Sequence, residues 1–244
     1  MPRELRPLAR ALSLRTGEVD GLRAWRPVPG APRRAGEAGA GGRSDALAVC
    51  VGVGTERARA STERVLSALR PDAVLVVGVA GAVSATLRVG DVIAPARVVD
   101  ARTGAAYVPS WDHQGGTGSG AGCGAGAAAM RRGTLVTVPR FGAPLGADAT
   151  AVDMETAAIA AACAERGVPW DVRRGVSDAA GEVTPAVAGL LRPDGRADLV
   201  AVVRLLGTHP TELVRLVRLG RSTGRGLRAM TEAALDVVTG SGAT

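Results

Sequence analysis

Two carboxylates stand at the ends of one apolar stretch of the chain, residues 151–181, and each could do chemistry. Glu155 opens an alanine-rich run with Asp153 just before it, and Asp178 closes a valine-rich run. A carboxylate can accept two hydrogen bonds from a vicinal diol, which is one way to hold a ribose. A carboxyl group that is partly desolvated has a raised pKa and can donate a proton near neutral pH. The sequence therefore offers Glu155 as a diol ligand and Asp178 as a general acid.

Both residues also have a purely structural interpretation. Asp178 could cap the turn that follows its strand. Glu155 is expected in the first turn of a helix, where the helix dipole favours a carboxylate. Taken alone, the pattern leaves the role of Asp178 undecided and favours the structural role for Glu155.

A third feature is the pair of glycines, Gly78 and Gly81, near the end of the most apolar segment, AVLVVGVAGAV (73–83). Because glycine has no side chain, backbone N–H groups there could approach an anion closely. The signal is weak by itself, since buried strands often end in glycine. With two histidines and three dispersed cysteines, the chain offers no cluster of metal ligands, so we expect no metal and no other cofactor.

Helix and strand patterns alternate along the chain and must position these residues. Apolar spacings of three or four indicate helices, and short continuous apolar runs indicate buried strands. The predicted helices are 4–14, 55–69 and 154–166, and the predicted strands are 46–54, 73–83, 90–101, 134–138 and 170–178. Two low-complexity segments, 27–44 and 115–129, are expected to be loops.

This alternation predicts an α/β fold, a three-layer sandwich with a mostly parallel central sheet. Ligands of such folds bind at the carboxyl ends of the strands. The segments expected at that edge are GVG (52–54), GVAGA (78–82), SDAAG (177–181) and the 139–142 turn. Such folds normally begin with a strand, whereas this chain begins with a helix pattern, so we expect the first strand to be missing. We treat residues 1–244 as one domain with a basic helical C-terminal extension, about 197–238.

Composition excludes several classes of protein. The net charge is +7, but all 30 basic residues are arginine in an Ala- and Gly-rich chain, which indicates a coding bias. Aromatic residues make up 2%, so no stacking platform for nucleic acid is expected. There is no apolar run long enough for a membrane span and no signal-peptide pattern. The odd, dispersed cysteines, Cys50, Cys123 and Cys163, are typical of free thiols in a reducing cytoplasm.

Three segments together resemble the nucleoside phosphorylase/nucleosidase superfamily. They are VLVVGVAGAVSATLRVGDVIAP, AVDMETAAIAAACAERGVP and RRGVSD, which carry a glycine turn with a V-G-D strand, a D/E-M-E helix start and a terminal S-D. The resemblance covers residues 46–101 and 134–182. The tail, RPDGRADLVAVVRLLGTHPTELVRLVRLGRSTGRGLRAM, resembles the C-terminal extension of hopanoid-associated phosphorylases, a subfamily associated with release of adenine from adenosylhopane.

The resemblance implies cleavage of the N-glycosidic bond of a purine nucleoside, with a 5′-substituted adenosine such as adenosylhopane as substrate. It implies that Glu155 binds the ribose hydroxyls and that Met154 packs against the sugar. It also implies that Asp178, in the Ser177–Asp178 pair, contacts N7 of the purine. Phe141 falls where a family aromatic stacks on the base, although its role as a core residue is an equal alternative. The resemblance also implies a homo-oligomer, a dimer, that binds a small-molecule nucleoside. The arginine bias and the few aromatic residues predict no binding of nucleic acid.

The nucleophile is left open between water and inorganic phosphate as a co-substrate. Phosphorolytic members bind phosphate with an Arg and a Ser where this chain has Val76 and Val79. Other arginines that could bind phosphate are Arg3, Arg6, Arg57 and Arg140. Hydrolytic members use a glutamate that matches Glu4 in position. A methylthioadenosine/adenosylhomocysteine nucleosidase-like hydrolase is therefore an alternative, and so is a catalytically impaired binding or regulatory protein on the same fold.

The tail carries arginines at a helical spacing. They are Arg215, Arg218, Arg221, Arg225 and Arg228, which recur every three or four residues. A basic amphipathic helix of this kind can lie on an anionic membrane, so peripheral membrane contact is one interpretation. The other is a surface helix whose apolar face covers the sheet, and the pattern favours this second interpretation.

Overall fold

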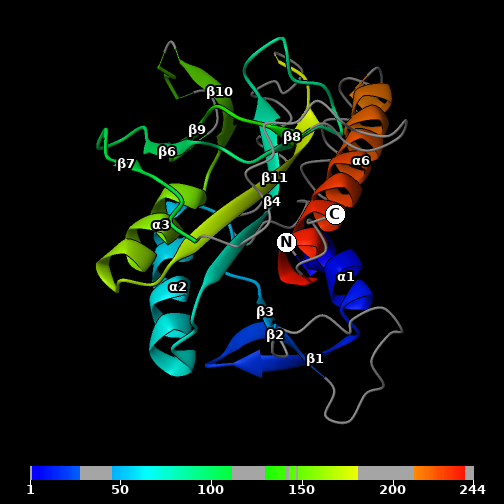
Figure 1. Cartoon of the computed structure of the whole chain (residues 1–244). Coiled ribbons are helices and arrows are strands. Elements are labelled where there is room, and N and C mark those ends of the chain that lie inside the picture. The colour runs from blue at the N-terminus through cyan, green and yellow to red at the C-terminus, as the bar shows by residue number, and fades with distance from the viewer. Residues whose placement is uncertain are drawn as a thin grey trace.

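The structure, a computed structural model, describes residues 2–27, 46–111, 130–140, 143–146, 148–180 and 212–239 (Figure 1). The helices are α1 (Pro2–Ala11), α2 (Thr55–Leu69), α3 (Thr156–Glu165) and α6 (Glu212–Thr239). The strands are β1 (Leu14–Val19), β2 (Leu22–Pro27), β3 (Ala48–Val49), β4 (Val74–Ala82), β5 (Val92–Ile93), β6 (Arg97–Asp100), β7 (Ala106–Tyr107), β8 (Met130–Arg131), β9 (Thr134–Thr137), β10 (Ala149–Asp153) and β11 (Trp170–Asp178). The loop predicted over 115–129 and nearly all of that over 27–44 lie outside the described residues.

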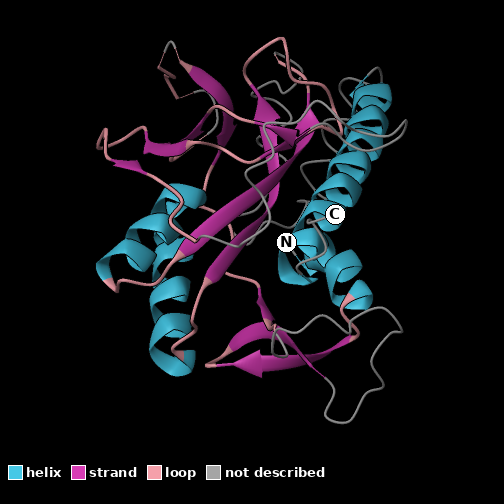
Figure 2. Ribbon diagram, in the orientation of Figure 1, coloured by secondary structure: helices cyan, strands magenta, loops and turns pink. Residues whose placement is uncertain are grey.

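An eight-stranded mixed sheet forms the middle layer, in the order β7-β6-β9-β10-β4-β11-β5-β8. Four of its neighbouring pairs are parallel, namely β6–β9, β9–β10, β4–β11 and β5–β8. Helices α2 and α3 lie on one side of the β4–β11 pair, and α1 and α6 lie on the other (Figures 1 and 2). The predicted three-layer α/β fold is confirmed.

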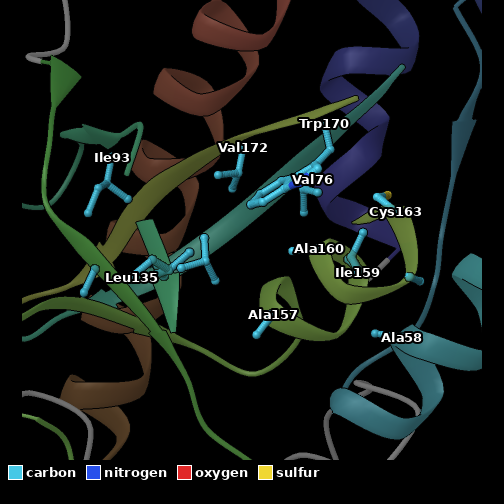
Figure 3. Close-up of a cluster of buried hydrophobic side chains, with 14 of the residues drawn as sticks. Ala58, Val76, Ile93, Leu135, Ala157, Ile159, Ala160, Cys163, Trp170 and Val172 are labelled. Atoms are coloured by element: carbon cyan, nitrogen blue, oxygen red, sulfur yellow. The ribbon is translucent and has the colours of Figure 1, made fainter. Parts of the chain in front are cut away.

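The face toward α2 and α3 is packed with small and branched apolar side chains. Val76 of β4 and Val172 of β11 pack with the alanines of α3, and Trp170 belongs to the same cluster (Figure 3). Seven of the ten residues of α3 are buried, which an alanine-rich helix permits because short side chains let its backbone approach the sheet. This close approach fixes the start of α3, and therefore Glu155, against the sheet.

The opposite face is covered by α6, with α1 beside it. Met230 and Ala234 of α6 pack with Leu8 of α1 and with Trp25 of β2. The apolar side of α6 is therefore occupied by the protein's own core. The surface-helix interpretation of the tail is confirmed for the part of α6 whose side chains the structure describes.

The predicted strand 46–54 is wrong in length and in place. Only β3 is extended, and it pairs with β2 in a separate three-stranded sheet. Gly52 and Gly54 have φ of 91° and 90°, which breaks the extended run before α2. The β1–β2 hairpin was not predicted, although its turn residues Asp20 and Gly21, both with positive φ, form an Asp-Gly pair that is a strong hairpin signal.

Further boundaries differ from the prediction. The helix expected over 4–14 ends at Ala11, and Leu14 already belongs to β1. The strand expected over 90–101 is two strands, β5 and β6, separated by a segment that contains Pro95, which has no N–H to donate to a strand ladder. Strand β10 was not predicted. Because β10 runs through Asp153, α3 begins at Thr156, and Glu155 is the N-cap residue and not part of the first turn.

Candidate active site

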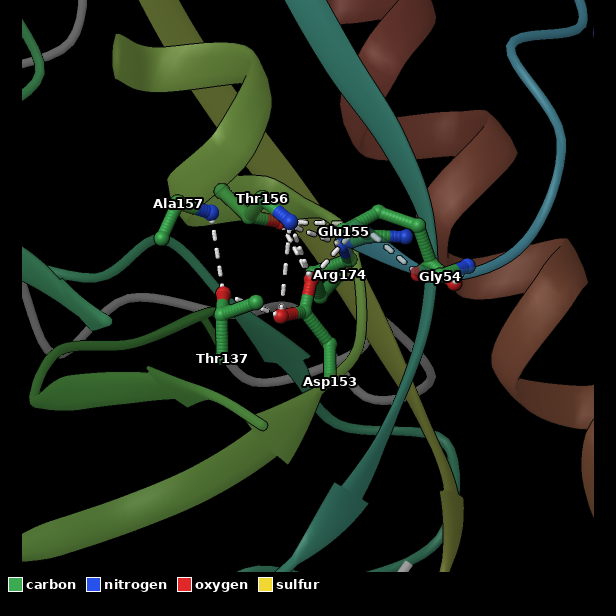
Figure 4. Close-up of polar contacts among 7 residues, drawn as sticks. All are labelled: Gly54, Thr137, Asp153, Glu155, Thr156, Ala157 and Arg174. Atoms are coloured by element: carbon green, nitrogen blue, oxygen red, sulfur yellow. Dashed lines mark hydrogen bonds and ion pairs between the residues drawn. The ribbon is translucent and has the colours of Figure 1, made fainter. Parts of the chain in front are cut away.

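Glu155 stands at the junction of three elements: the end of β10, the start of α3 and the loop before α2. Its Oε1 accepts a hydrogen bond of 3.0 Å from the backbone N–H of Gly54, the N-cap residue of α2 (Figure 4). Its Oε2 lies 3.7 Å from Nη2 of Arg174 on β11. The side chain is 16% exposed, more than that of Arg174, which is 6% exposed.

Arg174 and Asp153 form a buried ion pair behind Glu155. Nη2 of Arg174 lies 2.6 Å from Oδ2 of Asp153 and donates to Oγ1 of Thr156 at 2.8 Å. Asp153 also accepts hydrogen bonds from Thr137 Oγ1, at 2.6 Å, and from the N–H of Thr156, at 3.2 Å. Asp153 and Glu155 carry two negative charges against the one positive charge of Arg174. The group therefore has a net charge of −1 when all three are ionised.

Asp178 ends β11 and is partly buried. The hydroxyl of Ser177 is hydrogen-bonded to Asp178 Oδ1, and the same Oγ lies 3.3 Å from the carbonyl oxygen of Ala80. A side chain at Gly81 would place its Cβ 2.8 Å from Asp178 Oδ2. Gly81 thus leaves the space in which the Asp178 carboxylate lies.

Gly78 makes room in the same way for Arg174. The two residues are paired in the parallel β4–β11 register, and a Cβ on Gly78 would lie 2.0 Å from Nη1 of Arg174. The sequence indicated Gly78 and Gly81 as points where an anion could approach the backbone. In the structure, the space beside each of them holds a β11 side chain.

The structure describes the other predicted site residues less fully. Met154 is partly buried in a small apolar cluster with Val136 and Val138. Phe141 lies outside the described residues. Glu4 belongs to α1, which packs on the α6 side of the sheet, and its side chain is outside what the structure describes. The roles expected for Met154, Phe141 and Glu4 stay predictions.

Arg174 was missed by the sequence reasoning, which expected the glycines of residues 52–54 at the ligand-binding edge but gave Gly54 no contact with Glu155. A charged residue inside an otherwise buried strand was the available signal for Arg174, because such a residue requires a partner. Nothing in the sequence indicated the contact between Gly54 and Glu155.

Arg174 and Asp178 are four residues apart on β11, and the register shifts between Val176 and Asp178, so their Cα atoms are separated by at most about 13 Å, the length of a regular strand. A ligand extended along this strand could contact both Glu155, beside Arg174, and Asp178.

Within the described ranges, no group of three or more His, Cys, Asp or Glu residues could hold a metal ion. Among the same residues, no helix is both long enough and apolar enough to cross a membrane.

The sequence matches the phosphorylase superfamily over residues 1–130 and 112–215. The chain therefore belongs to the phosphorylase superfamily. A search of the curated proteins found no match.

Three solved structures illustrate the shared fold. The 5′-methylthioadenosine/S-adenosylhomocysteine nucleosidase of Colwellia psychrerythraea, in complex with adenine, is 22% identical with a TM-score of 0.59 over 92% of each chain. The corresponding nucleosidase of Neisseria meningitidis, in complex with methylthio-immucillin-A, is 18% identical with a TM-score of 0.56 over 96% of each chain. The futalosine hydrolase of Helicobacter pylori is 16% identical with a TM-score of 0.55 over 91% of this chain and 94% of that one.

Family and fold together define the class. The protein is an enzyme of the nucleoside phosphorylase/nucleosidase superfamily, built on the same α/β fold as these nucleosidases.

Proposed function

We propose that the protein, within the class of enzymes that cleave the N-glycosidic bond of a purine nucleoside, acts on an adenosine substituted at its 5′ carbon. Glu155 binds the ribose 2′- and 3′-hydroxyls, and Asp178 protonates the departing adenine at N7. The observation that carries the proposal is the placement of both carboxylates by neighbouring groups: Gly54 and Arg174 contact Glu155, and Ser177 is bonded to Asp178.

The chemistry explains why two carboxylates are needed. Breaking the N-glycosidic bond leaves positive, oxocarbenium-like charge on the sugar and negative charge on the base. A proton from Asp178 neutralises the base as it leaves, which lowers the barrier because the interaction strengthens in the transition state. The net charge of −1 at the Glu155, Asp153 and Arg174 group favours the positive sugar.

The choice of adenine, and of a substituted 5′ carbon, rests on two supports. The nucleosidases reported above are named for 5′-methylthioadenosine and S-adenosylhomocysteine, and one was solved with adenine. The resemblance of the tail to hopanoid-associated phosphorylases favours adenosylhopane, a much larger 5′ substituent. The hopanoid assignment depends on the resemblance of this tail alone.

The nucleophile distinguishes two forms of the same reaction. Val76 of β4 is buried and Val79 is partly buried, so at these two positions β4 offers apolar side chains where phosphorolytic relatives have an Arg and a Ser. Arg57 lies close to the site, since its side chain covers Gly52 in the loop that reaches Glu155. Phosphate bound by an arginine of this kind, or water activated by Glu4, would complete the reaction.

The test is release of adenine. The protein is incubated with 5′-methylthioadenosine, S-adenosylhomocysteine, adenosylhopane and unsubstituted adenosine, each with and without inorganic phosphate. We expect adenine from at least one 5′-substituted substrate, at a higher kcat/KM than from adenosine. Release only with phosphate identifies a phosphorylase, and release without phosphate identifies a hydrolase. Binding without release from any substrate would favour the binding or regulatory protein and would overturn the proposal.

A dimer is the expected assembly, by resemblance to the superfamily. Light scattering at micromolar concentration measures the mass directly, and twice the mass of one chain is expected. A monomeric mass would contradict this expectation.

Peripheral membrane contact through α6 is proposed as an electrostatic contact. The exposed side of α6 carries Arg221, Arg225 and Arg228, while its apolar side is buried in the protein. Each arginine near an anionic bilayer contributes about 1 kcal/mol of binding free energy. We therefore expect flotation with vesicles that contain anionic lipid, weakened by added salt.

The control for this contact replaces the same number of exposed arginines elsewhere. Changing Arg221, Arg225 and Arg228 together to Gln should weaken vesicle binding by about 10²-fold. Changing Arg15, Arg23 and Arg102, which are also exposed, should not. Equal loss in both triple variants would show that only net charge matters, and would overturn a specific contact through α6.

A further inference from the structure

We propose that Asp153 is a positioning residue for ribose recognition: by holding Arg174, it keeps the guanidinium out of hydrogen-bond range of Glu155. The proposal rests on the proposed function, in which Glu155 binds the ribose diol. Its starting point is one nitrogen placed between two carboxylates. Nη2 of Arg174 lies 2.6 Å from Asp153 Oδ2 and 3.7 Å from Glu155 Oε2.

Burial explains why Asp153 holds the guanidinium. Its side chain is 1% exposed, against 16% for Glu155, and a buried carboxylate depends more on a charged partner because water cannot solvate it. Thr137 and the N–H of Thr156 donate further hydrogen bonds to Asp153, which fix the position of its carboxylate. The Thr137 hydroxyl is itself held by the N–H of Ala157. Asp153 is therefore a fixed anchor at the base of the site.

The position of Arg174 is restricted from the other side by β4. Nη1 occupies the space beside Gly78 that a Cβ would fill, and Nε and Nη2 both donate to Thr156 Oγ1, at 3.1 and 2.8 Å. The guanidinium is thus held by β4, by the start of α3 and by Asp153 at once. The contact with Asp153, at 2.6 Å, is the closer of the two ion pairs that offset its charge, since Glu155 lies at 3.7 Å.

Loss of the charge on Asp153 would change the partner of Arg174. Glu155 would be the nearest remaining carboxylate, and a buried guanidinium would move the short distance needed to pair with it. A carboxylate engaged by a close bidentate partner has fewer lone pairs for a diol. The expected consequence is weaker recognition of the ribose, with recognition of the base unchanged.

The experiment compares Asp153→Asn with a matched control, Asp171→Asn. Asp171 pairs with Arg173 at 2.6 Å on the same strand and is similarly buried, so its loss also removes a buried ion pair. The steady-state KM for the best nucleoside of the panel reports ribose recognition, and the inhibition constant of adenine reports the base alone. Calorimetric binding of adenosine and of adenine is measured in parallel, and thermal unfolding monitors the fold.

We expect Asp153→Asn to raise the nucleoside KM by about 10- to 100-fold, the range for lost hydrogen bonds to a charged group. The adenine inhibition constant should change less than about threefold, and Asp171→Asn should lower the unfolding midpoint without raising KM. Asp153→Glu keeps the charge, so its nucleoside KM should lie much closer to that of the wild type. If Asp153→Asn does not fold, Thr137→Val removes one hydrogen bond from Asp153 and should shift KM in the same direction by a smaller factor.

The outcomes separate this inference from the proposed function. Wild-type protein that cleaves nucleosides, with equal KM in Asp153→Asn and Asp171→Asn, would overturn the inference and keep the function. Wild-type protein that cleaves nothing, but binds adenosine more tightly than adenine, would overturn the function. The inference then stands if Asp153→Asn removes that preference and falls if it does not. Wild-type protein with no preference for adenosine over adenine would overturn both.

Discussion

The two faces of β11 each hold a buried arginine paired with an aspartate, yet only one pair lies beside Glu155. Arg174 pairs with Asp153 at 2.6 Å on the face toward α3. Arg173 pairs with Asp171, also at 2.6 Å, and strand alternation places both on the face toward α6. Both pairs have side chains less than a tenth exposed.

The difference lies in what the rest of the chain brings to each face. On the α3 side, Arg174 lies beside Asp153 at the end of β10 and Glu155 at the start of α3. Gly54, in the loop before α2, donates a hydrogen bond to Glu155. On the α6 side, the pair joins residues two apart on one strand, and the helix packs against Gly175. A buried ion pair therefore forms part of a binding site only where other functional groups lie beside it.

The largest expected effect is at Asp178, the last residue of β11. Asp178→Asn keeps the shape of the side chain but removes the acidic proton, so kcat should fall by about 10²–10⁴-fold. The measurement is steady-state release of adenine from the best substrate, with Asp171→Asn as the control aspartate of the same strand. A loss of less than about tenfold would remove Asp178 from the role of general acid.

The next effect is expected at Glu155. Glu155→Gln retains hydrogen-bonding ability but loses the charge that strengthens the bonds to a diol. Hydrogen bonds to charged groups contribute about 1.5–3 kcal/mol, so KM should rise by about 10- to 100-fold. The inhibition constant of free adenine, measured with the same enzyme, should not change. An unchanged KM would place Glu155 in its structural role as the N-cap of α3.

On the α6 face, the expected effect is on stability. A Cβ on Gly226 would lie 2.7 Å from the carbonyl oxygen of Val176, and one on Gly175 would lie 2.0 Å from the carbonyl oxygen of Gly226. Because both obstacles are backbone atoms, Gly226→Ala should lower the free energy of unfolding by about 1–3 kcal/mol. Gly224, two residues away in α6, has no atom within 4 Å of its added Cβ.

Gly224→Ala is therefore the matched control for Gly226→Ala. The same substitution there should raise stability by up to about 1 kcal/mol, because alanine favours the helix over glycine. Denaturant unfolding of both variants measures the two changes. Similar shifts in both would show that α6 does not pack closely on β11.

The smallest effect is expected from Cys163, which probes the packing of α3. Burial raises the pKa of the Cys163 thiol to about 11, from an ordinary value of 9.0. The unfolded chain ionises first as pH rises, so the contribution of this thiol to stability is present below about pH 9 and is lost between about pH 9 and pH 11. Unfolding of wild type and Cys163→Ala across this range should show a steeper loss in the wild type. Parallel curves would mean that the thiol is accessible to water.

The sequence determined the strong local elements. Helices α2 and α3, strands β4, β9 and β11, and the two carboxylates at the ends of 151–181 follow from apolar periodicity and from charge in apolar surroundings. These signals are local, because a few neighbouring residues set helix or strand preference. Elements with weak local signals, such as β10 and the two-residue strands β7 and β8, were not predicted, because their pairing partners decide whether they form.

Only the tertiary structure decided which of two adjacent arginines belongs to the site. Arg173 and Arg174 are the same residue type in the same strand, and the pleat sends them to opposite faces. The contact of Gly54 with Glu155 joins residues 101 positions apart, and the space at Gly78 exists because β4 and β11 pair in one particular register. Such contacts depend on how distant segments pack, and no short stretch of sequence contains that information.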